Sequence, residues 1–365
     1  MTMAVLTHPL LQTEWPLIQA PMAGVQGARL AVAVSEAGGL GSLPCAMLSP
    51  DALRAELTVL RTQTRRPWNL NFFCHREAPP DAAREATWRR LLEPYHREFA
   101  TQPAPPGGAR APFSEHLADL IEEGGSLGMP KVVSFHFGLP SEQLLARIRI
   151  WGAKILASAT TVAEARWLED HGVDGVIAQG LEAGGHRGHF LAHDRGDDPA
   201  DPVALLSQAG TFALLPQIVD AVLVPVIAAG GICTAQGVAA ARALGASAVQ
   251  VGTAFLLCPE ADTPPLHRAA LRAARDAPQS RPTALTNLFT GRPARGLVNR
   301  LMRELGPIHP DVPAFPLAGA ALAPLRAEAE RRGNSDFSPL WAGQNVGGCL
   351  EIDAASMTRQ LAAGW

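Results

Sequence analysis

Few cysteines, no long apolar run and almost no net charge characterise this sequence, and each scarcity excludes a class of protein. The five cysteines among 365 residues are an odd number, lie far apart and form no CxxC pair. This argues for reduced thiols and against a disulfide framework or a structural zinc site. The longest apolar stretch, residues 221–229, is too short and too broken by proline to cross a membrane. What remains is a globular chain, 47% apolar, that is long enough to bury a large core.

The charge balance indicates which classes of partner to expect, and the first residues indicate where the protein is located. The net charge is −3 and the arginines are scattered, so nothing attracts nucleic acid or anionic lipid in general. No basic residue precedes Arg29 and no early apolar run resembles a signal core, so we expect a cytoplasmic protein. No set of histidines and carboxylates has transition-metal spacing. Asp194, Asp197 and Asp198 are typical of a solvated loop, although such a run could hold a cation.

Short apolar runs of strand type alternate with alanine-rich helical segments along most of the chain. Alternation of near-continuous apolar strands with helices predicts a parallel sheet covered by helices. Eight such units favour an α/β fold of the closed (β/α)8 TIM barrel type over an open doubly wound sheet. The expected strands are 17–19, 40–42, 68–72, 132–135, 154–157, 175–178, 226–228 and 248–251. The expected helices include 28–37, 49–60, 141–150, 161–171 and 234–244, several with Ser or Thr at the cap position.

Two stretches break this alternation. Residues 75–130 carry proline- and glycine-rich segments around helical pieces, and residues 259–335 are helical, arginine-rich and interrupted by prolines. Insertions that leave from strand ends tend to cover the active face of a barrel. We therefore expect a barrel built from residues 1–74, 131–258 and 336–365, with a smaller, mostly helical lid or substrate lobe built from the two excursions.

The last two expected strands end in glycine turns. The seventh ends in AGG (229–231) and the eighth in QVGT (250–253). In a barrel these two loops form the usual phosphate pocket, where glycine N–H groups and a helix N-terminus point at the anion. Either turn alone is equally well a tight strand-to-helix connection. The pair in this order favours a phosphorylated ligand.

Three further strand ends carry groups that suit a planar ring. Pro21, Met22 and Ala23 offer little side-chain bulk after the first strand, although a core methionine after a proline is the commoner case. Asn71 ends the third strand with an amide that can donate and accept, or can cap a turn. Gln179 ends the sixth strand just before a run of glycines and could offer its amide to a ring edge in the same way.

The loop after the sixth strand, GLEAGGHRGHF (180–190), is the sharpest candidate for chemistry. It places His186 among glycines on the reactive face of the barrel. An imidazole near its usual pKa is a free base at pH 7 and exchanges protons readily. His136, in SFHFG, is the rival for the base. Arg292 and Arg295 of GRPARG could screen an anionic substrate, but a solvated helix start is the plainer interpretation.

Taken together, these segments resemble the nitronate monooxygenase family, the FMN-dependent barrel enzymes once called 2-nitropropane dioxygenases, and within it the bacterial type. The resemblance covers most of the chain and implies FMN bound without a covalent link and His186 as the catalytic histidine. The segments that carry it are QAPMAG (19–24), NFFCH (71–75), VSFHFG (133–138), AQGLEAGGHRG (178–188), AAGGI (228–232) and QVGTAF (250–255). The flavin contacts that it implies are Pro21, Met22, Ala23, Asn71, Gln179, Gly184, Gly231, Gln250, Val251, Gly252 and Thr253.

The resemblance implies FMN-dependent oxidation of alkyl nitronates by dioxygen to a carbonyl compound and nitrite, and leaves open the use of neutral nitroalkanes. Small molecules are the expected partners, and the chain could act as a monomer or a homodimer. One alternative is an NAD(P)H-dependent flavin reductase of quinones or enoyl thioesters; the absence of a GxGxxG unit decides little. The other is a phosphosugar lyase or isomerase without flavin. The lid departs most from the family, since Tyr95 is the only tyrosine and substrate contacts must come from residues such as Phe289.

Overall fold

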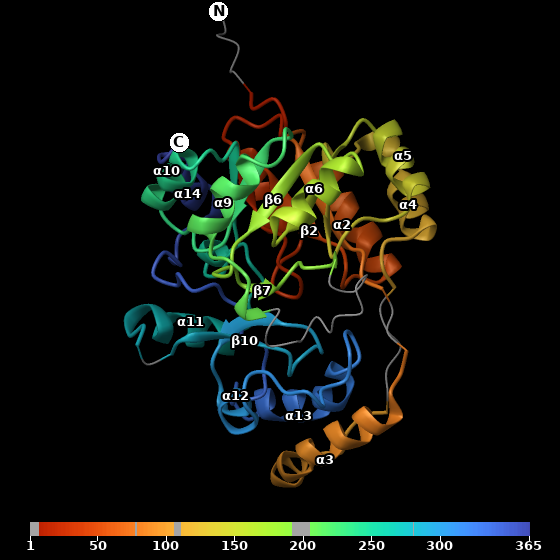
Figure 1. The fold of residues 1–365 in the computed structure, drawn as a ribbon, viewed down its shortest axis with the longest axis vertical. Coiled ribbons are helices and arrows are strands. Elements are labelled where there is room, and N and C mark those ends of the chain that lie inside the picture. Colours follow the sequence, from red (N-terminus) through yellow and green to blue (C-terminus); the bar gives the residue numbers. More distant parts are fainter. Residues whose placement is uncertain (1–6, 77–78, 106–110, 192–204, 280) are drawn as a thin grey trace, which may run out of the picture.

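The computed structural model describes residues 7–76, 79–105, 111–191, 205–279 and 281–365, which form a barrel with a smaller lobe below it (Figure 1). Eight parallel strands run in the order β1-β9-β8-β6-β5-β4-β3-β2. The Ile18–Leu40 bridge brings β1 and β2 together, with Gln19 N–H donating to Leu40 O at 2.9 Å. The sheet thus closes on itself, and the predicted TIM barrel is confirmed.

The eight strands lie where the apolar runs predicted them, with ends shifted by at most two residues. Burial on both faces explains why they are largely apolar: one face points into the barrel and the other toward the helices. The strands are β1 (Leu17–Gln19), β2 (Gly41–Pro44), β3 (Trp68–Phe73), β4 (Val132–His136), β5 (Lys154–Ala159), β6 (Gly175–Gln179), β8 (Val226–Ala229) and β9 (Ala248–Val251).

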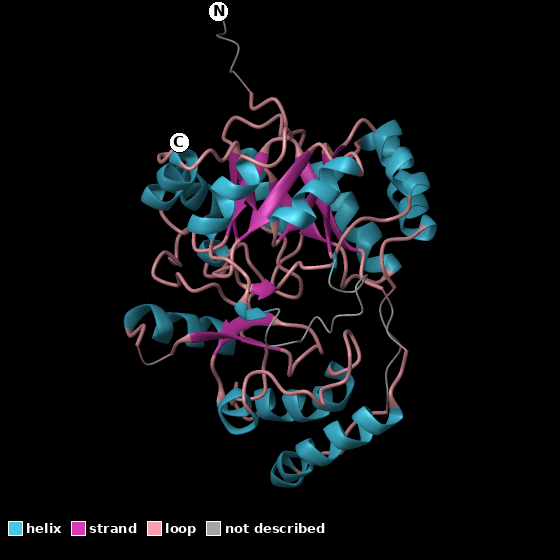
Figure 2. Ribbon diagram, viewed as in Figure 1, coloured by secondary structure: helices cyan, strands magenta, loops and turns pink. Residues whose placement is uncertain are grey.

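Helices cover the outside of the barrel (Figure 2). Four of them begin at the predicted caps, where Ser49, Ser141, Thr161 and Thr234 each accept a backbone N–H of the first turn. The covering helices are α1 (Ala28–Glu36), α2 (Pro50–Gln63), α4 (Glu115–Glu122), α5 (Glu142–Ile150), α6 (Val162–Asp170), α9 (Thr211–Val219), α10 (Ala235–Ala243) and α14 (Ala354–Ala362). None of the helices in the described part of the chain is long and apolar enough to span a membrane.

The smaller lobe has a core of its own, in which Trp88 and Tyr95 pack with Leu325 and Phe337. It is not purely helical, because it contains an antiparallel sheet of three strands: β10 (Thr283–Thr286), β11 (Ala294–Leu297) and β7 (Gly185–His186). Its helices are α3 (Ala82–Phe99), α12 (Arg300–Leu305) and α13 (Gly319–Arg331), with α11 (Pro265–Asp276) beside the sheet.

The first excursion contributes helices both to the smaller lobe and to the barrel. Helix α3, from the first excursion, packs against α13 of the second. Helix α4, from the same first excursion, instead packs against α2, and Phe113, Leu120 and Ile121 lie in the barrel core. Residues 113–122 therefore act as the barrel helix between β3 and β4, and only the preceding segment reaches the smaller lobe.

Candidate active site

The strand register brings the predicted residues to one end of the barrel, facing the smaller lobe. Gln179 pairs with Ala229, and Ala229 with Gln250, so these three residues lie at one level. On the other side of the barrel Asn71 pairs with Ser134. The strands β6 and β8 end at Gln179 and Ala229, and β9 ends one residue after Gln250.

A buried amide network fixes the turn after β1. Gln26 Oε1 accepts the N–H of Met22 at 3.2 Å and the Gln19 amide at 2.6 Å, and Gln26 Nε2 donates to Ser42 O at 2.5 Å. Since both glutamines are buried, every bond that they make to the backbone resists movement of the turn. The Pro21–Met22–Ala23 segment is thereby held next to Gly252, whose added Cβ would lie 3.3 Å from Ala20 Cβ and 3.5 Å from Met22 Sδ.

The two late glycine turns have hydrogen-bonding capacity to spare. No described residue accepts a hydrogen bond from the backbone N–H of Gly231, Gly252 or Thr253. The side-chain Oε1 of Gln250 is buried and likewise has no partner within the described ranges. Unpaired buried polar groups are costly, so this arrangement fits a bound anion with polar groups attached. The residues present therefore fit the phosphate and ribityl parts of FMN.

A segment that the sequence analysis did not single out holds these turns in place. We call residues 342–345 the C-terminal strap. Gly343 N–H donates to Thr253 Oγ1 at 2.9 Å, and Asn345 Nδ2 donates to Gly231 O at 3.0 Å. A Cβ on Gly184 would lie 2.6 Å from Gly343 N, so Gly184 is required for the strap to pack against the loop. The sequence AGQN gives no strand or helix signal, and only its glycine hinted at such a close approach.

The two candidate ring-binding amides are partly engaged within the protein. Asn71 Nδ2 donates to Ser134 O at 3.1 Å and to Ser134 Oγ at 3.0 Å, which leaves Oδ1 as an acceptor. Gln179 Nε2 donates to His186 O at 2.9 Å, and its Oε1 accepts Gly188 N–H at 2.8 Å. Gln179 thus fixes the His186 loop and retains one N–H for a ligand.

The His186 loop is tied to both parts of the molecule. Gly185 and His186 form β7, which pairs with β11 of the smaller lobe at Arg295 and Ala294. Arg187 is fully buried, and its guanidinium donates to Gly180 O at 2.6 Å, Gln179 O at 2.9 Å and Gln208 Oε1 at 2.7 Å. The loop is therefore held rigidly despite its glycines, and His186 projects from a strand.

His186 lies in apolar surroundings that keep its imidazole neutral. Its Nε2 is 3.0 Å from Thr290 Oγ1, and that hydroxyl can donate to Arg292 O at 3.3 Å. In this arrangement Nε2 carries the proton and Nδ1 is the free acceptor. Burial, together with the nearby His136 and Arg292, lowers the pKa of His186 to about 3. The expectation of an ordinary imidazole pKa is not met: the base is free at pH 7 but weak.

His136, the rival base, is engaged at both nitrogens. Its Nε2 donates to His186 O at 3.1 Å, and its Nδ1 lies 3.1 Å from Ser158 Oγ. Because a carbonyl can only accept, Nε2 must carry the proton and Nδ1 must accept from Ser158. Burial lowers the pKa of His136 to about 3. Of the two histidines, only His186 keeps a ring nitrogen without a hydrogen-bond partner among the described residues.

The interpretation of Arg292 and Arg295 as a solvated helix start is wrong. Residues 294–297 form β11, and both arginines are buried, at 2% and 5% exposure. Arg295 Nε donates to Leu181 O at 2.9 Å. The Arg292 guanidinium lies 4.0 Å above the ring of Phe137 and donates to His189 O. Burial lowers the pKa of Arg292 to about 9, so it remains a cation at neutral pH near His186.

Phe137 combines this contact with a strained backbone. Its φ is +71°, a left-handed conformation that costs a side chain other than glycine about 1 to 3 kcal/mol. Its ring contacts the Arg292 guanidinium on one side, and its centroid lies 5.9 Å from that of the His186 ring. Such outliers persist where packing over-determines them, often at functional sites.

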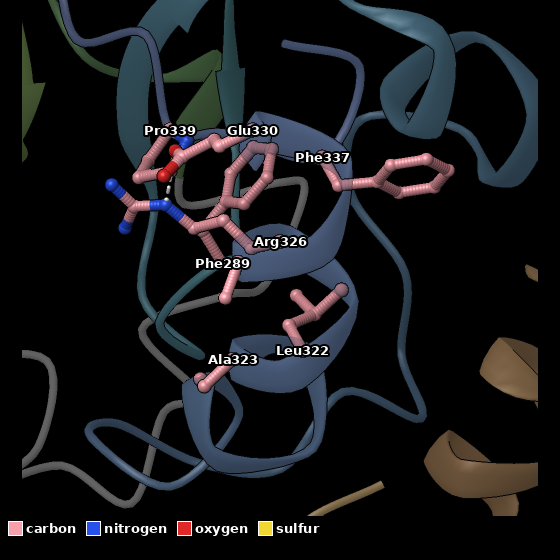
Figure 3. A pocket seen from close by; sticks show the side chains of 9 residues that line it. Phe289, Leu322, Ala323, Arg326, Glu330, Phe337 and Pro339 are labelled. Atoms are coloured by element: carbon pink, nitrogen blue, oxygen red, sulfur yellow. Dashed lines mark hydrogen bonds and ion pairs between the residues drawn. The ribbon is translucent and has the colours of Figure 1, made fainter. Parts of the chain in front are cut away.

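Two other features were considered as sites. A pocket of about 320 Å³ opens in the smaller lobe along α13, where Arg326 pairs with Glu330 at 2.7 Å (Figure 3). One of its lining residues, Phe289, also meets the ring of Trp341, with ring centroids 5.7 Å apart. No group of metal-binding side chains occurs in the described part of the chain. The suggested cation run at Asp194, Asp197 and Asp198 lies outside the described residues.

We expect histidines with a lowered pKa to make the protein labile to acid. Burial lowers the pKa of His136 and His186 to about 3 and of His267 to about 4. Below about pH 6.5 the unfolded chain binds protons that the folded chain does not, so the free energy of unfolding falls as pH falls. The loss should be about 1 kcal/mol for each histidine between pH 7 and pH 5.5. Urea unfolding at the two pH values measures it.

Replacing one of these histidines measures its contribution to the pH dependence of stability. His267→Gln should reduce the loss of stability between pH 7 and pH 5.5 by about 1 kcal/mol, the contribution of one such histidine. Equal stability at pH 7 and pH 5.5 in the wild type would contradict the lowered pKa values of these histidines.

Comparison with known proteins agrees with this geometry. The sequence model of the nitronate monooxygenase family matches residues 5–362. The chain is 41% identical over 359 residues to a nitronate monooxygenase from Pseudomonas aeruginosa, with 96% of each covered, and 40% identical to one from Paraburkholderia phytofirmans, with 97% of this chain and 93% of the relative covered. Nitroalkane oxidase from Streptomyces ansochromogenes has a similar structure, with a TM-score of 0.83 at 38% identity and 96% of each chain covered. The chain belongs to the nitronate monooxygenase family.

Proposed function

We propose that this protein is an oxidoreductase that uses FMN and dioxygen to oxidise alkyl nitronates to a carbonyl compound and nitrite. The observation that carries the proposal is the meeting, at one end of the barrel, of two glycine turns with uncommitted N–H groups and a neutral His186 on a rigid strand. Membership of the family supports the same reaction class.

The residues that would hold FMN fall into two groups. The turns at Gly231 and at Gly252–Thr253 would receive the phosphate, with Gln250 and Gly184 beside them. The Pro21–Ala23 segment, Asn71 Oδ1 and the remaining N–H of Gln179 would face the ring. When bound, FMN supplies the electron acceptor for the nitronate and the route of electrons to dioxygen.

The protein's own contribution is electrostatic and steric. The buried Arg292 cation lies near His186 and stabilises a nitronate anion more than a neutral nitroalkane. His186 Nδ1 accepts the carbon proton when a neutral nitroalkane is bound, but its lowered pKa makes it a weak acceptor. We therefore propose that nitronates are the better substrates. Aromatic rings around His186 keep water from the reacting carbon.

The visible absorption spectrum of the purified protein, followed by oxygen uptake on adding ethyl nitronate, tests the proposal. A flavin spectrum and nitronate-dependent oxygen uptake with release of nitrite are expected. Rapid bleaching of the flavin by NADH under anaerobic conditions, without nitronate turnover, would favour a reductase instead. A colourless protein that cannot be reconstituted with FMN would favour the phosphosugar enzyme.

A further inference from the structure

The C-terminal strap, residues 342–345, is hydrogen-bonded to both late glycine turns. Gly343 N–H donates to Thr253 Oγ1 at 2.9 Å, and Asn345 Nδ2 donates to Gly231 O at 3.0 Å. The two donors come from residues only two positions apart, so the strap bridges the turns over a short span. Both bonds use acceptor atoms of the turns and leave the N–H groups of the turns free for a ligand.

The bond from Gly343 decides how the Thr253 hydroxyl can be used. A hydroxyl has one proton to donate and two lone pairs that accept. Because Thr253 Oγ1 accepts the N–H of Gly343, one lone pair is occupied and the hydroxyl proton points elsewhere. No residue in the described part of the chain accepts that proton. The Thr253 hydroxyl is therefore a second free donor, in addition to the N–H of the same residue.

The bond from Asn345 fixes the orientation of one peptide group in the other turn. In a planar trans peptide the C=O and the following N–H point in opposite directions. Since Gly231 O faces Asn345, the N–H of Ile232 points away from the strap. Ile232 is buried, and its N–H has no acceptor within the described ranges. Gly230 and Gly231 have φ of +113° and +74°, so this turn has the conformational freedom of glycine and depends on outside bonds for its orientation.

The backbone of the strap is held by bonds that do not involve the Asn345 side chain. Cys233 Sγ donates to Asn345 O at 3.0 Å, and Gln344 N–H donates to Glu182 O at 3.0 Å. A Cβ on Gly348 would lie 2.5 Å from Cys233 Cβ, so the chain after the strap packs directly on the turn. Removing the Asn345 amide should therefore leave the strap in place.

One carboxylate lies beside the Gly231 turn, where a Cβ on Gly231 would be 3.4 Å from Glu182 Cβ. The Glu182 carboxylate accepts Thr211 N–H at 2.8 Å and the Thr211 hydroxyl at 2.9 Å, so it is committed to the start of α9. Burial lowers the pKa of Arg295, and attraction to Glu182 opposes that shift, so a buried cation balances the carboxylate. Glu182 therefore does not use up the free donors of the turns.

We propose that the C-terminal strap positions the donors that bind the phosphate of FMN, with Asn345 as the positioning residue of the Gly231 turn. This inference rests on the proposed function, because FMN is the phosphorylated ligand that it assumes. Gly343 makes the Thr253 hydroxyl a donor, and Asn345 holds the Ile232 N–H on the side away from the strap. Donors that are already oriented bind an anion more tightly, because they need no ordering when the ligand arrives.

Flavin titrations of the apoprotein test Asn345, with riboflavin as the probe that lacks the phosphate. Asn345→Ala should raise the Kd of FMN about 10-fold or more, while the Kd of riboflavin changes by less than about twofold. Asn345→Asp keeps the size of the side chain but cannot donate as a carboxylate, and it should weaken FMN binding at least as much. Quenching of flavin fluorescence measures each Kd without turnover. A loss confined to FMN separates positioning of the phosphate donors from general loosening of the site.

Gln217→Ala is the matched control. The Gln217 side chain is exposed on α9 and its amide donates to Ala213 O at 2.8 Å, so this variant also deletes an amide that donates to a backbone carbonyl. Both flavins should bind it as they bind the wild type. Thr253→Val and Thr253→Ser test the other turn and decide the proposal if Asn345→Ala does not fold. Valine removes the hydroxyl and should raise the Kd of FMN about 10-fold or more, whereas serine keeps the hydroxyl and should bind FMN nearly as the wild type does.

The outcomes separate the two proposals. Unchanged FMN binding in folded Asn345→Ala, or an equal loss of FMN and riboflavin, overturns the positioning role and leaves nitronate oxidation standing. Full FMN affinity in Thr253→Val contradicts the use of the Thr253 hydroxyl as a donor. A wild-type protein that binds neither flavin removes the proposed function and this inference with it.

Discussion

Replacing His186 with asparagine is expected to leave FMN content and most nitronate-dependent oxygen uptake in place, while turnover of a neutral nitroalkane falls about 100-fold or more. A nitronate is already deprotonated at carbon and needs no base, whereas a nitroalkane must first lose a proton. Asparagine is polar and of similar size but cannot accept a proton at neutral pH. Within the described ranges the side chain of His186 hydrogen-bonds only to Thr290, so its loss should not open the fold.

The measurement compares oxygen uptake with nitroethane and with preformed ethyl nitronate for wild type and variant. His171→Asn serves as the matched control, because His171 is exposed and stacks on Trp167 away from the barrel mouth. If the variant loses both activities in equal proportion, His186 positions the substrate and does not remove a proton. If both are unchanged, His136 becomes the candidate, despite having both nitrogens engaged.

The barrel was largely predictable because its determinants are local. Each strand is a short apolar run, and Ser or Thr caps mark the helix starts, so residues near in sequence decide the element. Helix α4 is an element that local sequence did not assign correctly. Its Leu120 and Ile121 have no distinctive local signal, and only packing against α2 assigns them to the barrel. Neighbouring proline- and glycine-rich sequence suggested an excursion instead.

The candidate site, too, was predictable only in part. Strand ends meet at one face of a barrel by topology, so the positions of Asn71, Gln179 and Gly252 follow from the strand assignment. Contacts between distant segments could not be predicted. The C-terminal strap reaches the two glycine turns from 90 and 114 residues away in sequence, and Trp341 reaches His186 from more than 150. The two-residue strand β7 exists only because β11 lies beside it.

The largest effect on the cofactor is expected from Gly252→Val. The N–H groups of Gly252 and Thr253 have no acceptor among the described residues, and a charged acceptor there would be worth about 1.5 to 3 kcal/mol for each bond. A valine side chain would keep the phosphate from these groups, and loss of two such bonds corresponds to FMN binding weaker by about 100-fold or more. The added Cβ would lie 3.3 Å from Ala20 Cβ, a tight contact that requires a small shift of the turn, and 3.5 Å from Met22 Sδ.

Flavin content of the purified variant and titration of the apoprotein with FMN, followed by quenching of flavin fluorescence, measure this loss. Circular dichroism establishes that the variant is folded, and Gly252→Ala provides a milder variant with a smaller expected loss. Gly237→Val is the matched control, because its Cβ would make only ordinary contacts, at 3.6 Å, within α10 and the preceding turn. Full FMN occupancy in folded Gly252→Val would show that the phosphate is bound elsewhere, since no side chain could share that space with the anion.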